Sequence, residues 1–198
     1  MSQTANVSGM APPSPRTAEE MVTLAASVLG KHGTVRLKDY DRFPAPLYAT
    51  DETGTLVYFN RACVSFAGRE PTIGVDKWCV SWKLRKDDGS PLPKDECPMA
   101  VAVQTARPVR GVEAIAEQPD GGAKRFRPFP TPALDKEGRV VGAVNLLVPT
   151  DGKMWRDLIA TAQKCRRLAG WVDDSAASTT LTNMAVECEG QAHLLRIS

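Results

Sequence analysis

The sequence predicts an α+β fold, in which one antiparallel sheet carries helices on one face, with an N-terminal helix and a C-terminal helical hairpin as additions. Two Asp-X-X-Gly segments, Asp51 to Gly54 and Asp135 to Gly138, each precede an apolar stretch. Asp and Gly suit the first and last positions of a tight reversal, because the carboxylate accepts backbone N–H groups and Gly tolerates positive φ. Each segment therefore indicates a β-hairpin. Helical spacing of apolar residues in the last 48 positions supplies the third observation.

The N-terminal part is expected to hold one helix outside the sheet. Residues 1–15 are small, polar and Pro-rich, and are predicted to be disordered. Thr17 to Glu20 form a capping box, and Gly30 is expected to end the helix, so that helix and linker occupy residues 16–40. One face is apolar: Met21, Leu24, Ala25, Val28 and Leu29. This face needs a cover, either the chain's own sheet or the same helix of a second subunit, and a homodimer is expected on that ground.

The first two strands and a short helix follow. Residues 43–50 and 55–60 are rich in aromatic and branched side chains, as in a half-buried sheet. Residues 61–67 are predicted to form a short helix that stops at Gly68. Residues 83–96 are polar and contain proline, and two interpretations stay open for them, a lid over a pocket or a solvated insertion. A helix is predicted for residues 97–106, with Pro98 at a tolerated early position.

The remaining strands are predicted at residues 109–118, 124–134 and 140–148. Pro119 to Gly122 supply the turn between the first two. Alternating prolines at 128, 130 and 132 place their missing N–H groups on one side of the strand, so only one neighbouring ladder loses donors. The last strand is apolar on both faces apart from Asn145, which is typical of a central strand covered twice.

The tail, residues 151–198, is predicted to be an antiparallel helical hairpin. Gly170 and Asp173 to Ser175 break the pattern and supply an N-cap between the helices. Apolar residues recur at helical spacing on both sides of the break: Trp155, Leu158, Ile159, Ala162, Cys165, Leu168, Ala169 and Val172, then Leu181, Met184, Ala185, Cys188, Ala192 and Leu195.

Residues 41–150 resemble the PAS domain, a small sensory fold. The resemblance rests on the strand at 55–60, Asn60, Gly68 and the ending Gly138-Arg139-Val140-Val141-Gly142. It implies a five-stranded antiparallel sheet with helices on one face. Many members continue from Asp-Ile-Thr into an attached output domain, whereas this chain has Val148-Pro149-Thr150. The tail is similar to that of many short bacterial proteins and is too short for a kinase, so an output would act in trans.

The resemblance also implies where a ligand would lie, between the inner face of the sheet and the helices after the second strand. Trp78 and Trp82 are four residues apart and would share one face of a helical turn. The predicted lining is Tyr48, Phe59, Trp78, Trp82, Met99, Val103, Ile115, Phe126 and Asn145. The alternative is that these residues simply fill the core. Asn145 is the most informative, because a lone amide in an apolar strand needs a ligand or a backbone group as partner.

The sequence speaks against both cofactors common in such domains. Haem-binding members ligate iron through a His on the helix corresponding to residues 97–106, and this helix has none, although Cys97 and Met99 remain remote substitutes. Flavin photoreceptors carry an Asn-Cys-Arg-Phe-Leu-Gln motif where this chain has Lys77-Trp78-Cys79-Val80-Ser81-Trp82. Cys79 is expected to be a small buried hydrophobe, with a redox-sensing thiolate as the alternative.

Composition excludes several further classes. The net charge is +2 for 198 residues, without a basic run interleaved with aromatics, which argues against a nucleic-acid partner. Five widely spaced cysteines without Cys-X-X-Cys indicate a reducing cytoplasm. No apolar stretch reaches membrane-spanning length. No Cys/His, Ser/His/Asp or carboxylate pair falls within the predicted core, and Glu113 and Glu117 are taken as a wet strand face, so the chain is not expected to be an enzyme or to bind a metal.

The sequence thus predicts a cytoplasmic signal-sensing module. A small molecule in the core would alter the packing of the sheet, and the flanking helices would pass the change to a dimer mate or to a separate signalling protein. The alternative is a ligand-free adapter that binds proteins through its flanking helices. A sensor predicts a cavity behind Trp78 and Trp82 that Asn145 can reach, whereas an adapter predicts close packing there and an apolar patch on the helices.

Overall fold

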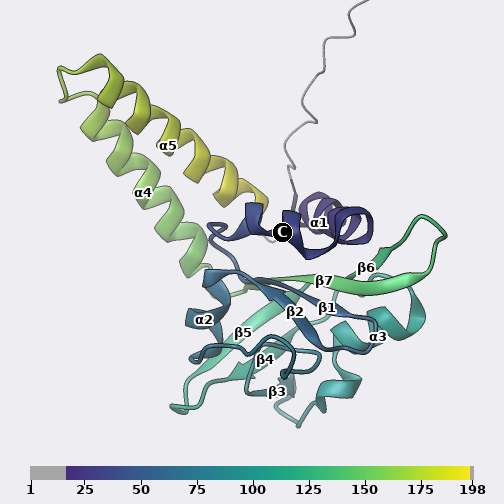
Figure 1. Cartoon of the computed structure of the whole chain (residues 1–198). Helices are drawn as coiled ribbons and strands as arrows, with labels where there is room; N and C mark the ends of the chain where they lie inside the picture. Colours follow the sequence, from purple (N-terminus) through teal and green to yellow (C-terminus); the bar gives the residue numbers. More distant parts are fainter. Residues whose placement is uncertain (1–16, 197–198) are drawn as a thin grey trace, which may run out of the picture.

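The computed structural model describes residues 17–196, in which seven strands form one antiparallel sheet. The strands are β1 (Leu47–Asp51), β2 (Leu56–Phe59), β3 (Lys83–Lys86), β4 (Ala114–Glu117), β5 (Ala123–Pro128), β6 (Thr131–Leu134) and β7 (Val140–Pro149). Hydrogen-bonded neighbours follow the order β2-β1-β7-β5-β4-β3. β6 lies outside this order and pairs with β7 at residues 140–144, whereas β5 pairs with β7 at residues 147–149. Figure 1 shows the long β7 running through the middle of the sheet. The α+β class predicted from sequence is confirmed, whereas the disorder predicted for residues 1–15 lies outside the described residues.

Two differences raise the strand number from the predicted five to seven. Part of the polar segment 83–96 is β3, an edge strand whose Leu84 is buried while its neighbours are exposed, and it pairs with β4. The predicted strand 124–134 is divided at Phe129 and Pro130 into β5 and β6, which pair with different parts of β7. The first strand begins at Leu47 rather than 43, and β4 begins at Ala114 rather than 109.

Both Asp-X-X-Gly turns form as predicted. The Asp51 carboxylate accepts N–H groups of Thr53 at 2.9 Å and Thr55 at 2.8 Å, and Gly54 has φ +80°. Burial alone would raise the pKa of Asp51, but the hydrogen bonds from Thr53 and Thr55 outweigh it and lower that pKa. Asp135 accepts the N–H group of Arg139 at 2.8 Å in the same way. These carboxylates fix the register of β1 with β2 and of β6 with β7.

Asn60 organises the chain that enters β1. Its Oδ1 accepts the N–H group of Leu47 at 3.0 Å, and its Nδ2 donates to the Ala45 carbonyl at 2.9 Å. The side chain is buried. Because these groups would otherwise be unsatisfied, one amide replaces a stretch of regular pairing before β1. The motif that carried the family resemblance therefore has a clear structural task.

Two helices cover the inner face of the sheet. They are α2 (Arg61–Ala67), which ends at Gly68 in the left-handed conformation, and α3 (Pro98–Thr105), with Pro98 in its first turn. A short 3-10 helix, Lys94–Glu96, leads into α3. In Figure 1 both helices lie on the side of the sheet away from the N-terminal helix. Their apolar faces and the sheet enclose one core cluster, named here the inner core: Tyr48, Leu56, Cys63, Phe66, Cys79, Val80, Leu84, Cys97, Met99, Ala100, Val103, Ala114, Ala116, Phe126, Ala143 and Leu147.

The N-terminal helix α1 (Ala18–His32) covers the outer face over β6 and β7. Thr17 caps it by accepting the N–H group of Glu20 at 3.1 Å. Gly30 does not end the helix as predicted; α1 continues to His32, and Gly33 with φ +64° follows. A Cβ at Gly30 would overlap the carbonyl oxygen of Leu134, so this glycine allows the helix to touch β6. The apolar face of α1 is thus covered by the chain's own sheet.

The buried face of α1 is rotated from the one predicted. It consists of Met21, Val22, Ala25, Ala26 and Leu29, whereas Leu24 is 40% exposed. These residues join the outer faces of β1 and β7 and the 3-10 helix Gly33–Tyr40, whose Leu37 is fully buried, in a second cluster, named here the outer core. Because α1 needs no second subunit to bury this face, the helix gives no support to a dimer.

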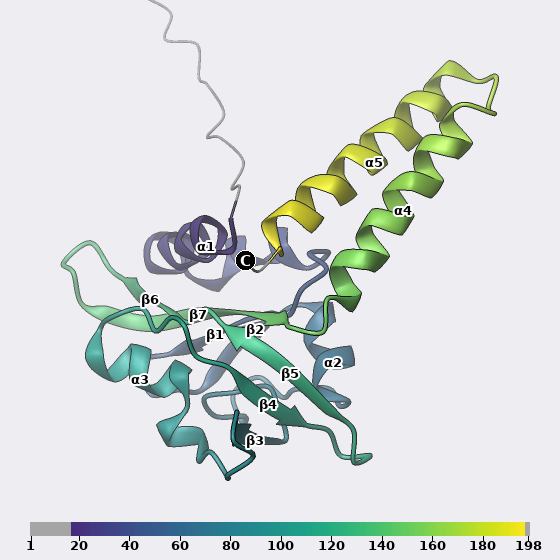
Figure 2. The same ribbon diagram turned by 180° about the vertical axis from the view of Figure 1, so that it is seen from behind.

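The tail forms the predicted hairpin, from α4 (Lys153–Ala169) and α5 (Ser175–Leu194). Asp174 caps α5 by accepting the N–H groups of Ala176 at 2.8 Å and Ala177 at 3.1 Å. Figures 1 and 2 show the hairpin projecting from the domain, with the end of α5 returning beside α1. There Leu194 and Leu195 are buried in the outer core.

Candidate functional site

A chain of hydrogen bonds crosses the inner core where the sequence placed a ligand. The N–H group of Phe129 donates to Asn145 Oδ1 at 2.9 Å, and Asn145 Nδ2 donates to the Tyr48 hydroxyl at 3.1 Å. That hydroxyl donates to the Trp78 carbonyl at 3.0 Å. Tyr48 and Asn145 face each other across β1 and β7. Each polar side chain thus has a partner within the protein, and Asn145 uses the backbone partner considered from sequence.

Burial raises the pKa of Tyr48 well above its ordinary value. Desolvation disfavours the phenolate in a core without cationic neighbours, so the hydroxyl stays a hydrogen-bond donor at all physiological pH values. The chain from Phe129 to Trp78 is consequently insensitive to pH, and its task is to position β1, β7 and the segment that carries Trp78.

Trp78 is held in a conformation that is uncommon for a residue with a side chain. Its φ is +63°, in the left-handed region. Its N–H group donates to Gly54 at 2.7 Å, while its carbonyl accepts from Tyr48. The indole ring lies over Gly54, where a Cβ would overlap it. Such backbone strain costs about 1–3 kcal/mol and persists only where the surroundings determine it.

Most of the nine predicted lining residues do come together. Tyr48, Met99, Val103 and Phe126 belong to the inner core, Phe59 and Trp78 pack against it, and Asn145 joins it through Tyr48. The ring of Phe126 meets Phe66 edge to face, with centroids 5.2 Å apart. Whether these residues bind a ligand stays a prediction.

Two of the predicted residues lie elsewhere. Residues 77–82 form no helical turn, so Trp82 does not share a face with Trp78; it is 44% exposed, with the ammonium of Lys83 4.3 Å from its ring centroid. Ile115 lies on the outer face, because its neighbours Ala114 and Ala116 are the residues of β4 that point into the inner core. The sequence prediction assumed that the larger residue, Ile115, faces the core, whereas in β4 the small alanines face it.

Burial keeps two of the thiols of the inner core, Cys63 and Cys97, in the neutral form. Desolvation raises the pKa of Cys97 to about 12 and also raises that of Cys63, so neither is a thiolate at neutral pH. Cys79 is buried in the same cluster. Among residues 17–196, no three His, Cys, Asp or Glu side chains are grouped so as to hold a metal ion. The remote haem substitutes Cys97 and Met99 are both closely packed in the inner core.

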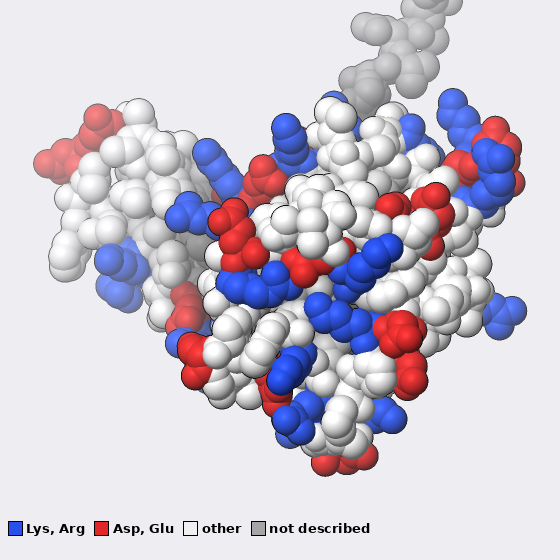
Figure 3. Space-filling model, turned by 60° about the horizontal axis from the view of Figure 1, so that its bottom comes forward, with Lys and Arg blue, Asp and Glu red and all other residues white. Residues whose placement is uncertain are grey.

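The strand carboxylates of the outer face are paired with arginines. Glu113 accepts from Arg127 at 3.1 Å, and Glu117 pairs with Arg85 across β4 and β3. Neither carboxylate faces the other as an acid/base pair would. On the face drawn in Figure 3, basic and acidic side chains are interspersed rather than gathered in one basic field.

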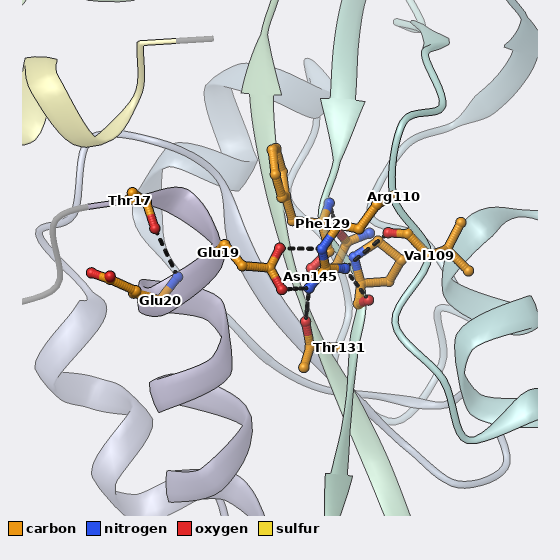
Figure 4. Close-up of polar contacts among 9 residues, drawn as sticks. Thr17, Glu19, Glu20, Val109, Arg110, Phe129, Thr131 and Asn145 are labelled. Atoms are coloured by element: carbon orange, nitrogen blue, oxygen red, sulfur yellow. Dashed lines mark hydrogen bonds and ion pairs between the residues drawn. The ribbon is translucent and has the colours of Figure 1, made fainter. Parts of the chain in front are cut away.

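An arginine that the sequence analysis missed fastens α1 to the sheet. Arg110 Nη2 donates to Glu19 Oε1 and to the Thr131 hydroxyl, at 2.8 and 2.7 Å, and Nη1 donates to the Pro130 carbonyl at 2.7 Å. Its guanidinium also lies over the Phe129 ring, 5.6 Å from the centroid. Figure 4 shows Arg110 between α1 and the strands, with Asn145 close behind. No motif surrounds Arg110, so only the tertiary structure shows this role.

The sheet now gives the arrangement that the sequence resemblance predicted. The first two strands lie beside the last one, β5 and β4 follow on its other side, and α2 and α3 cover one face. The fold is PAS-like.

Solved structures with this PAS-like fold resemble the chain at low identity. The Rhodobacter sphaeroides LOV protein is 13% identical, with a TM-score of 0.44 over 76% of this chain and 88% of its own. The PAS domain of the fruit-fly ELK potassium channel is 13% identical, with a TM-score of 0.47 over 58% of this chain and 94% of its own. A PAS domain from Colwellia psychrerythraea is 18% identical, with a TM-score of 0.41 over 60% and 96%. No protein-family model and no curated protein matches the sequence.

A projecting helical hairpin is attached to this PAS-like fold. Its own core is small, with only Ala162, Cys165 and Ala185 buried between the helices. Large apolar side chains stay exposed along it: Trp155 37%, Leu168 37%, Trp171 82%, Met184 46% and Val186 56%. None of the helices within residues 17–196 has the length and apolar character of a membrane span.

Proposed function

We propose that the protein is a signal-sensing module of PAS-like fold that acts in trans, and that its C-terminal hairpin is the output element through which two copies associate. The observation that carries this proposal is the exposure of large apolar side chains on a projecting hairpin, while the Tyr48 and Asn145 side chains are paired within the inner core. Exposed apolar side chains on an element that projects from the domain are suited to contact with another protein chain.

The occupant proposed for the hairpin is the hairpin of a second copy. α4 contains five Lys or Arg residues and one acidic residue, whereas α5 contains two Glu residues and neither Lys nor Arg. An antiparallel arrangement would place the basic α4 of one copy against the acidic α5 of the other. Complementary charge favours this pairing and disfavours α4 against α4. Two such hairpins make a four-helix bundle, in which Leu168 and Met184 of each copy would be buried.

The base of the hairpin packs directly against the sheet. Met154 and Leu158 of α4 pack against the outer core, and Leu194 and Leu195 at the end of α5 are part of it. The same cluster includes α1 and the outer faces of β1 and β7. A change in the packing of the sheet therefore shifts the base of the hairpin, and any ligand that distinguishes the two packings shifts their populations.

Light scattering coupled to size exclusion tests the association. We expect the wild-type chain to be a dimer at about 50 µM. The double variant Leu168→Glu/Met184→Glu should be a monomer with an unchanged circular dichroism spectrum, because both side chains are already partly exposed in one copy. Ile73→Glu/Val75→Glu is the matched control, since these apolar residues are 57% and 70% exposed on a loop of the domain. A monomeric wild-type chain, or equal effects of the two variants, would contradict the proposal.

A second candidate is the core ligand predicted from sequence, because seven of the nine predicted lining residues converge around the inner core. The paired chain from Phe129 to Trp78 favours instead a filled core, as in the adapter alternative. Native mass spectrometry of the protein purified from its own host separates the two. A stoichiometric small molecule, released on denaturation, supports a core sensor, whereas a bare chain that also fails a thermal-shift ligand screen supports the adapter.

A further inference from the structure

An open hollow lies where the hairpin leaves the sheet. It has a volume of about 510 Å³, which is within the usual range for small-molecule sites. Its walls come from the residue before β4, from β5 and β7, from the first turn of α4 and from the residues that follow α5: Glu113, Arg127, Val148, Pro149, Thr150, Gly152, Met154, Trp155, Arg156, Leu195 and Arg196. None of these residues was among the predicted site residues.

Positive charge dominates the polar wall of this hollow. Three arginines, Arg127, Arg156 and Arg196, line it together with one acidic residue, Glu113. Only Arg127 is paired with that carboxylate, through Nη2 at 3.1 Å. Within residues 17–196, Arg156 donates to the backbone carbonyl of Asp151 at 3.1 Å and has no carboxylate partner, and no ion pair involves Arg196.

One of these donors is buried without an acceptor. Arg127 Nε is shielded from solvent and has no hydrogen-bond partner among the described residues. A buried N–H group of a charged side chain that lacks an acceptor costs free energy, and such groups need an explanation. Because Nε is shielded from solvent, an anion in the open hollow would meet the other donors of the guanidinium groups, which present planar pairs that match a carboxylate.

Another part of the lining is apolar. Val148 and Leu195 are buried beneath the hollow, Met154 is partly buried, and the Trp155 ring is 37% exposed at its rim. A small inorganic anion would leave this wall in water. A ligand with one anionic end and an apolar body would cover it and gain the free energy of apolar burial.

We propose that this hollow binds a small monocarboxylate with an apolar body, with the carboxylate among the three arginines and the body against Trp155 and Leu195. The inference rests on the proposed function in one respect, namely that the hairpin is the output element. The ligand would touch α4 through Trp155 and Arg156 and the end of α5 through Leu195, so that it contacts both helices of the hairpin at their base.

The base of α4 can respond to such a ligand because it is only partly supported by the domain. A second hollow of about 470 Å³ lies along α4, lined by Pro44, Lys124, Asp157 and Leu158 among others, and Met154 and Pro149 border both hollows. α4 is therefore flanked by open space beside its first turns. Filling the first hollow would restrict the directions in which the hairpin can lean.

Isothermal titration calorimetry of the full chain with octanoate tests the site. 1-Octanol supplies the apolar body without the charge, and inorganic phosphate supplies an anion without the body. We expect octanoate to bind at least tenfold more tightly than either. The double variant Arg156→Gln/Arg196→Gln should weaken octanoate binding at least tenfold, because each lost guanidinium removes charge-assisted hydrogen bonds. Arg42→Gln/Arg107→Gln, at two exposed arginines outside the hollow, is the control and should leave binding unchanged.

Each other result overturns a stated part of the proposal. Equal binding of 1-octanol shows that the hollow takes apolar molecules without reading charge. Equal binding of phosphate shows a bare anion site, and equal loss in both double variants shows non-specific attraction to the protein. No binding of octanoate, with each variant folded by circular dichroism, rejects the site.

The failure of the site and the failure of the proposed function can be told apart. The titration reports the site whatever the oligomeric state, and light scattering with saturating octanoate reports its effect on the association of two hairpins. Binding without a change in dimer dissociation would reject the coupling and keep the site. A monomeric wild-type chain that still binds octanoate would reject the proposed output and keep the site.

Discussion

The domain and the hairpin are built on different principles, although one outer core joins them. The domain surrounds its sheet on both faces with large buried side chains, and the buried Tyr48 and Asn145 side chains are bonded to each other. The hairpin buries three small side chains between two helices and leaves large ones in water. The domain buries enough large apolar side chains to fold alone, whereas the hairpin is closely packed only at its base. We therefore expect the domain to contribute most of the free energy of unfolding, and the hairpin to be the part that can change its position.

The largest expected effect separates the two cores directly. Leu147 is fully buried in the inner core, so Leu147→Ala should lower the free energy of unfolding by about 2–5 kcal/mol. Leu181→Ala, in the hairpin, removes the same atoms from a side chain that is only partly buried, and should cost less than half as much. Urea denaturation followed by circular dichroism gives both values. Equal losses would show that hairpin and domain are equally well packed.

Gly→Ala substitutions at two positions, one in each region, should change the free energy of unfolding in opposite directions. Gly30→Ala forces a Cβ into the carbonyl of Leu134, and we expect a loss of about 1–3 kcal/mol in the free energy of unfolding. Gly190→Ala, on an exposed position of α5 with open space around it, should instead stabilise by about 0.5–1 kcal/mol. Thermal unfolding measures both. A neutral Gly30→Ala would mean that α1 is not seated closely on β6.

Acid should weaken the domain through Asp76. Its carboxylate accepts from Arg69 at 2.7 and 2.9 Å and from the Thr72 N–H group at 2.8 Å. Burial alone would raise the pKa of Asp76, but these bonds and the Arg69 charge lower it below its ordinary value. A lowered pKa contributes stability that is present above the unfolded-state value, about 3.9, and is lost as pH falls through the folded-state value.

The variant Asp76→Asn should therefore be less stable than wild type at pH 7, and the difference should shrink as the pH falls below about 4. Urea midpoints measured at several pH values between 7 and 2.5 give the comparison. Asp173→Asn serves as the control, since Asp173 is exposed in the loop between α4 and α5. A difference between wild type and Asp76→Asn that does not depend on pH would contradict the role given to the carboxylate.

The smallest effect is expected in the hairpin. Arg166 Nε and Nη2 donate to the Glu189 carboxylate at 2.9 and 2.6 Å, but both side chains are nearly half exposed. Exposed ion pairs contribute little because water and salt screen them. Arg166→Gln should leave the unfolding midpoint unchanged within error, both at low salt and in 1 M NaCl. A clear loss that disappears in high salt would reveal a stronger pair than this exposure allows.

Much of the fold follows from local signals in the sequence. Asp-X-X-Gly turns, the Thr17 and Asp174 caps and the stop at Gly68 act within a few residues, and each forms as predicted. The segment from 77 to 82 differs because its conformation depends on contacts from distant elements. Tyr48 and Gly54 hold Trp78 in a left-handed conformation, which no local pattern indicates.

The candidate sites show the same limit. Strand periodicity brought Tyr48, Phe126 and Asn145 together, but it could not tell that Ala114 and Ala116, rather than Ile115, face the inner core. Arg110 and the arginines of the hollow have no sequence signal, because their partners lie in other elements. Gly30 was predicted to end α1. The structure instead places it against the backbone of Leu134, where a larger residue would not fit, and this contact exists only because α1 packs on β6.

The alternating prolines of β5 and β6 affect whether a strand of another chain can pair with this part of the sheet. The N–H group of Phe129 points to β7, and the carbonyl of Pro130 points away from it, where it accepts from Val109 at 3.3 Å. The Pro130 carbonyl is thus occupied by Val109 and Arg110, and neither position 130 nor position 132 has an N–H group to offer along this side of β6. An incoming strand needs both kinds of group to extend a sheet. This border therefore resists the edge-to-edge growth that leads to fibrils, without needing a helix to cover it.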